Sequence, residues 1–192
     1  MRVLLAETRV LPPRVAWFRA RARRLARATG DEFTLASATR AEEVGRILAL
    51  ARGASTVVEL GTGTAWTSIA LALADRRRRV VTYDPISRPE RDGYLELAGR
   101  AARERIALVD RPGESGPLPG ADPPDFVFLD SSHEREETLA TFAAWRAALA
   151  PGGTIVFHDY DEPRYPGVTE AIRELGLEGE AFGHLFVHRT RA

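Results

Sequence analysis

The stretch Val57-Val58-Glu59-Leu60-Gly61-Thr62-Gly63-Thr64-Ala65-Trp66 decides the fold of this 192-residue chain. An apolar run that ends at an acidic residue, followed by a Gly-x-Gly turn and a helical run, is typical of the first strand, turn and helix of an open α/β sheet. A second apolar run, residues 80–83, ends at Asp84. Because a carboxylate in that place can accept hydrogen bonds from two ribose hydroxyls, the pattern predicts a site for a ribose-bearing cofactor.

The rest of the chain continues this alternation of strand and helix patterns. It predicts a Rossmann-like α/β fold with a mostly parallel seven-stranded sheet, helices on both faces and an antiparallel C-terminal hairpin. We expect one domain over 1–192, with an N-terminal helical extension over 1–38 and a cofactor-binding core over 39–192. The expected strands are 56–60, 80–83, 106–109, 125–129, 154–157, 177–182 and 185–188. The expected helices are 13–30, 39–53, 66–75, 90–103, 134–149 and 168–175, the second of them opening with Thr39 and Glu42 as a capping box.

Composition narrows the classes of function. The formal net charge is zero, and the sequence contains no cysteine, asparagine or glutamine. It also contains no lysine, so all 27 basic residues are arginine. These absences exclude thiol nucleophiles, disulfides, cysteine–zinc sites, Schiff-base lysines and the Walker-A lysine. The sequence has no apolar run long enough to span a bilayer, so we expect a cytoplasmic enzyme with no membrane partner.

Arginine is concentrated in two places. The first 30 residues contain eight arginines, and Val15, Phe18, Ala22 and Leu25 recur among them at helical spacing. This pattern predicts an amphipathic helix with a solvated charged face, and the alternative is a surface that binds phosphate or RNA. The arginine run 76–79 lies between a helix and a strand, and we interpret it as an exposed loop.

Polar clusters follow the expected strands where a binding site would gather them. In open parallel sheets, ligands bind beyond the carboxyl ends of the strands. The clusters are residues 59–64, Asp84, 110–115, 130–133 and 158–160. We therefore expect one site built from these five segments.

The glycine turn itself favours one cofactor class. A dinucleotide-binding turn needs a third glycine so that the helix can pack close to the strand, and Trp66 occupies that position here. Glu-x-Gly-x-Gly after the first strand, with an acid closing the second, instead resembles the class I S-adenosylmethionine-dependent methyltransferases. The resemblance implies S-adenosylmethionine as cofactor, with these candidate contacts: Glu59, Gly61, Thr62, Gly63, Thr64, Asp84, Glu114 near the adenine, and Asp130.

A second group of residues suggests a reaction. The segments Phe128-Leu129-Asp130-Ser131-Ser132-His133 and Val156-Phe157-His158-Asp159-Tyr160 resemble those of the small catechol-type and natural-product O-methyltransferases. A hydroxyl must lose its proton or bind a metal before it attacks a methyl group. Asp130 and Asp159 could hold a divalent ion such as Mg²⁺, and His133 could act as the general base. The resemblance implies the same catalytic roles and a small-molecule acceptor.

Two positions depart from the pattern of that family. Catechol-type enzymes have an asparagine after the second aspartate, where this chain has Tyr160. Related sugar methyltransferases have an acid before it, where this chain has His158. A metal at Asp130 and Asp159 is therefore one hypothesis. The other has no metal: Asp130 lies beside the cofactor or caps a helix, and Asp159 caps a loop.

Other classes of function stay open from the sequence. One is a nicotinamide-dependent oxidoreductase, and another is a protein that binds the cofactor without catalysis. A methyltransferase that binds RNA through the N-terminal arginines is a third, although we do not expect a nucleic-acid partner. The sequence also allows a homodimer, and it does not determine the oligomeric state.

Overall fold

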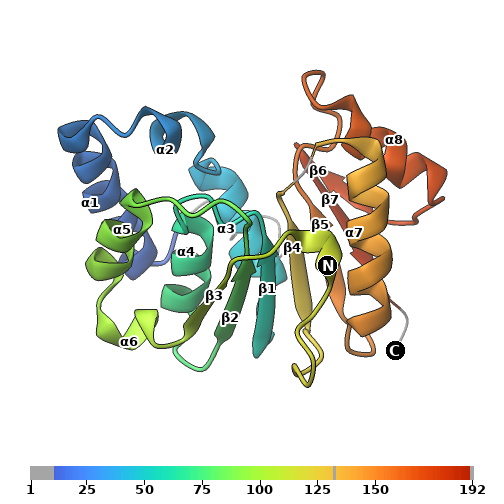
Figure 1. Cartoon of the computed structure of the whole chain (residues 1–192), viewed down its shortest axis with the longest axis horizontal. Helices are drawn as coiled ribbons and strands as arrows, with labels where there is room; N and C mark the ends of the chain where they lie inside the picture. Colours follow the sequence, from blue (N-terminus) through green and yellow to red (C-terminus); the bar gives the residue numbers. More distant parts are fainter. Residues whose placement is uncertain (1–10, 132, 191–192) are drawn as a thin grey trace.

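The computed structural model describes residues 11–131 and 133–190. Its centre is a seven-stranded sheet in the order β3-β2-β1-β4-β5-β7-β6 (Figure 1). Strands β1 to β5 are parallel, and β7 is antiparallel to its neighbours β5 and β6. The strands are β1 Thr56–Leu60, β2 Arg79–Tyr83, β3 Ile106–Val109, β4 Phe126–Leu129, β5 Thr154–Phe157, β6 Glu180–Phe182 and β7 Leu185–Arg189. The predicted fold class, including the antiparallel hairpin, is confirmed.

Helices cover both faces of this sheet. Figure 1 shows α1 to α6 on one side and α7 and α8 on the other. The helices are α1 Pro13–Thr29, α2 Glu32–Ser37, α3 Ala41–Leu50, α4 Trp66–Ala74, α5 Glu90–Ala98, α6 Arg100–Arg103, α7 Arg135–Ala148 and α8 Pro166–Glu174, with a short 3₁₀ helix η2 at Gly113–Ser115. Because both faces are covered, the central strands are apolar almost throughout, and all four residues of β4 are buried.

Trp66 explains why the glycine turn lacks its third glycine. The side chain is 3% exposed and packs edge-on between Phe18 of α1 and Tyr94 of α5, at ring-centroid distances of 6.1 and 5.4 Å. Its bulk fills the space between α1, α4 and α5, so Trp66 is a core residue rather than part of a pocket wall.

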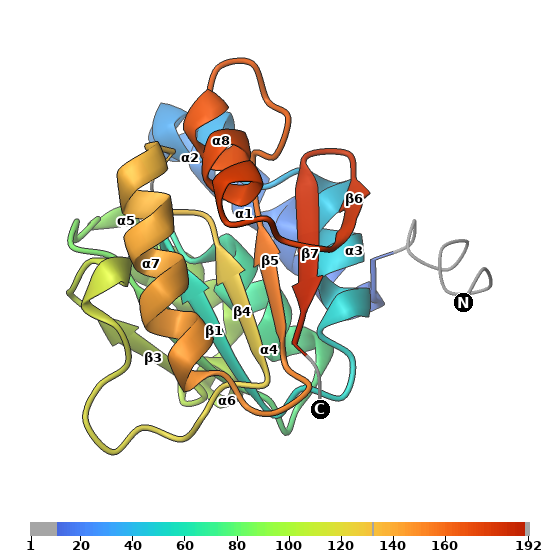
Figure 2. The ribbon, with the colours of Figure 1, turned by 90° about the vertical axis from the view of Figure 1, so that its right-hand side faces the viewer.

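The N-terminal segment is packed against the predicted core. α1 contacts α4 and α5, and α2 lies at the edge where the parallel strands end (Figure 2). The buried face of α1 includes Val15, Phe18 and Ala22, as its spacing predicts. Residues 1–10 of the predicted extension, with Arg2 and Arg9, lie outside the described residues.

Most predicted boundaries fall within two residues of the observed ones, but α3 ends three residues before its predicted limit and β6 begins three residues after its own. There are three further differences. α2 was not predicted. The third helix is capped by Arg40 and Glu43, and not by Thr39 and Glu42. The predicted helix over 90–103 is two helices, because Gly99 adopts a φ of +83° between α5 and α6.

The arginine run 76–79 is not wholly solvated. Arg78 is 2% exposed, and its guanidinium donates hydrogen bonds to the carbonyls of Ala51, Ala54 and Leu71. It therefore ties the ends of α3 and α4 to the start of β2. Among the described residues, no helix is both long and apolar enough to cross a membrane.

Candidate active site

The glycine turn joins the carboxyl ends of three neighbouring strands. Gly61 has a φ of +98°, and a Cβ atom there would lie 2.0 Å from the carbonyl oxygen of Asp130. Its N–H donates to the carbonyl of Tyr83 at 2.8 Å. Gly63 has a φ of +50°, and a Cβ atom there would meet only Phe33, at 3.8 Å. Glycine is thus required at Gly61 for β1 and β4 to approach, while the side of Gly63 where a Cβ would stand leaves room for a ligand to approach.

Glu59 lies beneath this turn. It is 2% exposed and accepts hydrogen bonds from Ser68 of α4 and from Thr82 of β2, the latter at 3.0 Å. Burial raises the pKa of Glu59 from 4.5 to about 8, and the charge of Asp130 acts in the same direction. The carboxyl is therefore held neutral at the base of the turn, and its predicted contact with a cofactor stays a prediction.

Asp84 closes β2 beside the turn. Its carboxylate accepts hydrogen bonds from the backbone N–H groups of Gly63 and Ile86, both at 2.8 Å. Arg91 of α5 is buried, donates to the carbonyls of Gly63 and Ile86, and lies 3.6 Å from the Asp84 carboxylate. These contacts hold the carboxylate at the position from which the sequence predicts that it binds ribose.

Two threonines of the turn are held by other elements. Thr62 shares a hydrogen bond of 2.7 Å with Thr82, and Thr64 accepts one of 2.9 Å from Thr34 of α2. α2 therefore lies against the glycine turn. Phe33, also of α2, is stacked against the guanidinium of Arg88, whose Cζ atom lies 3.4 Å from the ring centroid. The N-terminal segment thus borders the predicted cofactor site.

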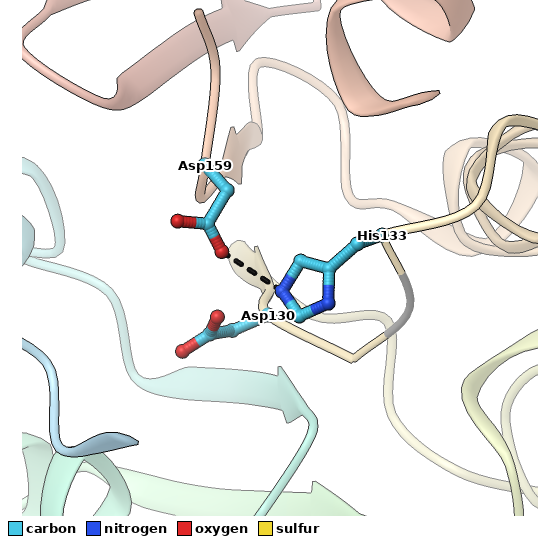
Figure 3. A group of neighbouring side chains, drawn as sticks. All are labelled: Asp130, His133 and Asp159. Carbon is cyan, nitrogen blue, oxygen red and sulfur yellow. Dashed lines mark ion pairs between the residues drawn. The ribbon is translucent and has the colours of Figure 1, made fainter. Parts of the chain in front are cut away.

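Asp130, His133 and Asp159 come together at the ends of β4 and β5, as the sequence predicts (Figure 3). One ligand-type atom from each lies within 4.8 Å of the others. The Nε2 atom of His133 is 2.8 Å from an oxygen of Asp159, and its Nδ1 atom points away from that carboxylate. The ring of Tyr165 stacks on the imidazole at 3.9 Å and 20°. The ring is therefore fixed on one edge and one face.

His158 stands between three carboxylates. Its Nδ1 atom lies 2.9 Å from Asp130 and 3.2 Å from Asp159, and its Nε2 atom lies 3.4 Å from Glu43 of α3. Burial alone would lower the pKa of His158, but the three acids raise it from 6.5 to about 12. Burial would raise the pKa of Asp159, but the two histidines hold it well below its ordinary value.

The backbone at Asp159 is strained. This residue adopts a φ of +56°, a left-handed conformation that costs on the order of 1 kcal/mol for a non-glycine residue. Strain of this kind persists where the surrounding structure requires one position of the side chain. Here it places the carboxylate against both histidines.

The remaining candidates lie elsewhere. Glu114 is exposed on η2, which packs beside Leu60 through Gly113, and its adenine contact stays a prediction. Tyr160 packs against Phe186. His184 and His188 lie on the hairpin and contact backbone carbonyls, as expected of structural residues.

Sequence reasoning missed three residues of this site. The sequence places His158 in one of the five polar clusters but predicts no role for it, and it gives no indication of Glu43 or Arg91. The histidine before Asp159, at the end of a strand, was the available signal for His158. Nothing local marks Glu43 or Arg91, because their partners are distant in the chain.

Comparison with known proteins identifies the family. A sequence model described as "Methyltransferase domain" matches residues 58–160, more than half of the chain. The chain therefore belongs to this family of methyltransferase domains. A comparison with curated proteins found no significant match.

Solved structures show the same fold. The O-methyltransferase from Bacillus cereus, in complex with S-adenosylhomocysteine, is 16% identical, with 89% of this chain and 90% of that chain covered and a TM-score of 0.67. The O-methyltransferase TomG from Streptomyces achromogenes, involved in tomaymycin synthesis and in complex with S-adenosylmethionine, is 21% identical, with 93% and 90% covered and a TM-score of 0.65. The TDP-rhamnose 3'-O-methyltransferase CalS11 of calicheamicin biosynthesis is 18% identical, with 77% and 78% covered and a TM-score of 0.61.

Proposed function

We propose that this protein transfers the methyl group of S-adenosylmethionine to a hydroxyl of a small molecule. The observation that carries the proposal is the placement of His133, held by Asp159, on the segment after β4 that packs against the glycine turn of a methyltransferase domain through the backbone of Asp130. A cytoplasmic location and a homodimer stay predictions from the sequence.

The turn fits the proposed cofactor. Gly63 leaves room on the side where a Cβ would stand, and the Asp84 carboxylate is fixed by the backbone N–H groups of Gly63 and Ile86. A fixed carboxylate can accept hydrogen bonds from both ribose hydroxyls without losing further conformational freedom. The bound cofactor supplies an electrophilic methyl group on its sulfonium. The solved neighbours with S-adenosylmethionine or S-adenosylhomocysteine support this assignment.

His133 is the proposed base. Because Asp159 occupies Nε2, the Nδ1 atom is the one left to take the acceptor's proton. A carboxylate on the far nitrogen orients the ring and stabilises the imidazolium that forms. With the cofactor bound, His133 would take the acceptor's proton at Nδ1, and the acceptor oxygen would replace the sulfonium sulfur at the methyl carbon. The products are a methyl ether, S-adenosylhomocysteine and a proton on His133.

A small acceptor suits the electrostatics better than RNA. The formal net charge is zero, so the chain as a whole has no field that would attract RNA. Arg19 of the N-terminal helix is buried against the carbonyl of Thr39, whereas the other arginines of α1 are exposed, as in a solvated helix face. One solved neighbour is involved in tomaymycin synthesis and another is a TDP-rhamnose 3'-O-methyltransferase, which supports a small hydroxylated acceptor.

The proposal is tested by following a radiolabelled methyl group from S-adenosylmethionine to a panel of phenols, catechols and sugar nucleotides. We expect transfer to at least one acceptor, and His133→Ala should lower kcat by about 10²- to 10⁴-fold, the usual contribution of a general base. His188→Gln, on the hairpin, is the matched control and should keep wild-type activity. Full activity in His133→Ala would remove the base from the mechanism.

A further inference from the structure

A groove lies between α1, α4, α5 and α6, which cover one side of the sheet (Figure 1). Its volume is about 690 Å³, within the range of about 300–1,000 Å³ that is usual for small-molecule sites. Most of its wall is apolar and includes Trp17, Phe18, Leu73, Leu97, Ala98 and Ala102. A groove of this size and lining can hold the apolar body of a small molecule.

The groove is separate from the glycine turn. α4 begins at Trp66, directly after the turn, whereas the groove borders the other end of this helix, at Leu73. The seven residues between these two positions span roughly 10 Å of α-helix. None of the residues that line the groove is a predicted contact of the cofactor or of the methyl acceptor. A molecule in the groove would therefore be neither.

Every charged residue that lines the groove is an arginine. Arg14 and Arg76 are exposed, and Arg105 is held in place because its Nη1 atom donates to backbone carbonyls at the end of α4 and the start of β2. Among the described residues, none of these three arginines forms an ion pair with a carboxylate. The formal net charge of the chain is zero, so this excess of positive charge is local to the groove.

Trp17 is an unusual residue for an exposed helix face. Its side chain is 59% exposed, whereas Trp66 and Trp145 are 3% and 1% exposed. The guanidinium carbon of Arg21 lies 4.4 Å from the centroid of the Trp17 ring, which brings a further positive charge to the same place. Tryptophan and arginine are the side chains in which binding energy is most often concentrated. Their combination here favours a ligand with an aromatic body and a negative charge.

We infer that this groove binds a small amphipathic anion, with an aromatic body against the apolar wall and a carboxylate, sulfonate or phosphate group beside Arg14 and Arg76. Burial of the body releases water from Trp17 and its apolar neighbours. The anionic group supplies the counter-charge that the arginines lack, through charge-assisted hydrogen bonds. The inference goes beyond the proposed function, because the groove takes no part in methyl transfer.

The site is tested with 1-anilinonaphthalene-8-sulfonate, a fluorescent aromatic anion, titrated into the full chain with excess S-adenosylhomocysteine present. We expect one sulfonate probe to bind per chain. N-phenyl-1-naphthylamine has the same rings without the sulfonate, and it should bind at least about tenfold more weakly because it forms no charge-assisted contact. Added salt should weaken the binding of the sulfonate and leave that of the neutral probe unchanged.

Two pairs of substitutions separate the groove from the general charge of the surface. Arg14→Gln with Arg76→Gln should weaken the binding of the sulfonate by at least about threefold and leave the neutral probe unaffected. Arg24→Gln with Arg77→Gln is the matched control. It removes the same charge from exposed positions of α1 and of the segment after α4 that do not line the groove, and it should bind as the wild type does. Trp17→Ala should weaken both probes by at least about threefold, since it removes an aromatic contact.

Three outcomes would overturn the inference. Equal affinities for the two probes, or equal losses in the two arginine pairs, would show that the groove does not select an anion. Wild-type affinity in Trp17→Ala would place the probe elsewhere on the molecule. A wild-type dimer in light scattering that Trp17→Ala converts into a monomer would assign the groove to a second copy of the chain. The substitutions are at exposed positions, and circular dichroism checks that each variant is folded. Failure of methyl transfer would refute the proposed function and leave these results standing.

Discussion

Replacing Glu59 by glutamine tests whether the carboxyl under the glycine turn is neutral. In the folded protein the pKa of Glu59 is raised from 4.5 to about 8, chiefly by burial. Between these values the unfolded chain has lost this proton and the folded chain has kept it. The unfolding free energy therefore falls as the pH rises, by about 1.4 kcal/mol per pH unit. The full effect is on the order of 5 kcal/mol at pH 8, and it is absent below pH 4.5.

Glutamine has no proton to lose, and its carbonyl can still accept from Ser68 and Thr82. We therefore expect the difference in unfolding free energy, Glu59→Gln minus wild type, to rise steadily between about pH 5 and pH 8. Urea unfolding followed by circular dichroism at each pH measures this slope, and any constant cost of the substitution drops out. Glu42→Gln is the control, because its side chain is 64% exposed and should give no slope.

Parallel stability curves for wild type and Glu59→Gln would show that Glu59 is ionised in the folded protein, and the argument for a neutral carboxyl would be refuted.

Two further predictions concern the turn and the base. Gly61→Ala should lower the unfolding free energy by more than about 4 kcal/mol, because the new Cβ would collide with the Asp130 carbonyl. The control is Gly53→Ala, at a similar positive φ but with open space around the new Cβ, and it should lower the unfolding free energy by only about 1–2 kcal/mol. Equal melting temperatures for the two variants would contradict this. Tyr165→Leu should lower kcat by about three- to tenfold through loss of the stack on His133, with the KM for the cofactor unchanged and Tyr165→Phe near wild type. An equal loss in the phenylalanine variant would point to the hydroxyl instead of the ring.

The sheet could be predicted because its strands are short apolar runs bounded by turn residues, and the observed β1, β3 and β5 match their predicted limits. The gathering of Asp130, His133 and Asp159 was also predictable. Parallel strands place their carboxyl ends at one edge, so residues that follow neighbouring strands must meet there. The metal and base roles of these residues rest on chemistry that the fold alone does not test.

Residues joined by long-range contacts could not be predicted. Glu43 and His158 are 115 positions apart, and only the packing of α3 under the end of β5 brings them together. The sequence predicts that Arg78 is part of a solvated run, because sequence spacing does not show that three backbone carbonyls near the ends of α3 and α4 accept hydrogen bonds from its guanidinium. The six-residue helix α2 is too short for a periodic pattern, although it borders the cofactor turn.

Binding of the cofactor is the most direct test of the central claim. Calorimetric titration with S-adenosylmethionine should show one site per chain in the wild type and no heat of binding with NADH. Asp84→Ala should weaken binding by at least about tenfold, because charge-assisted hydrogen bonds to the ribose are each worth about 1.5–3 kcal/mol. Asp92→Ala, on the exposed face of α5, should leave it unchanged. Binding of NADH in place of S-adenosylmethionine, or wild-type affinity in Asp84→Ala, would contradict the account.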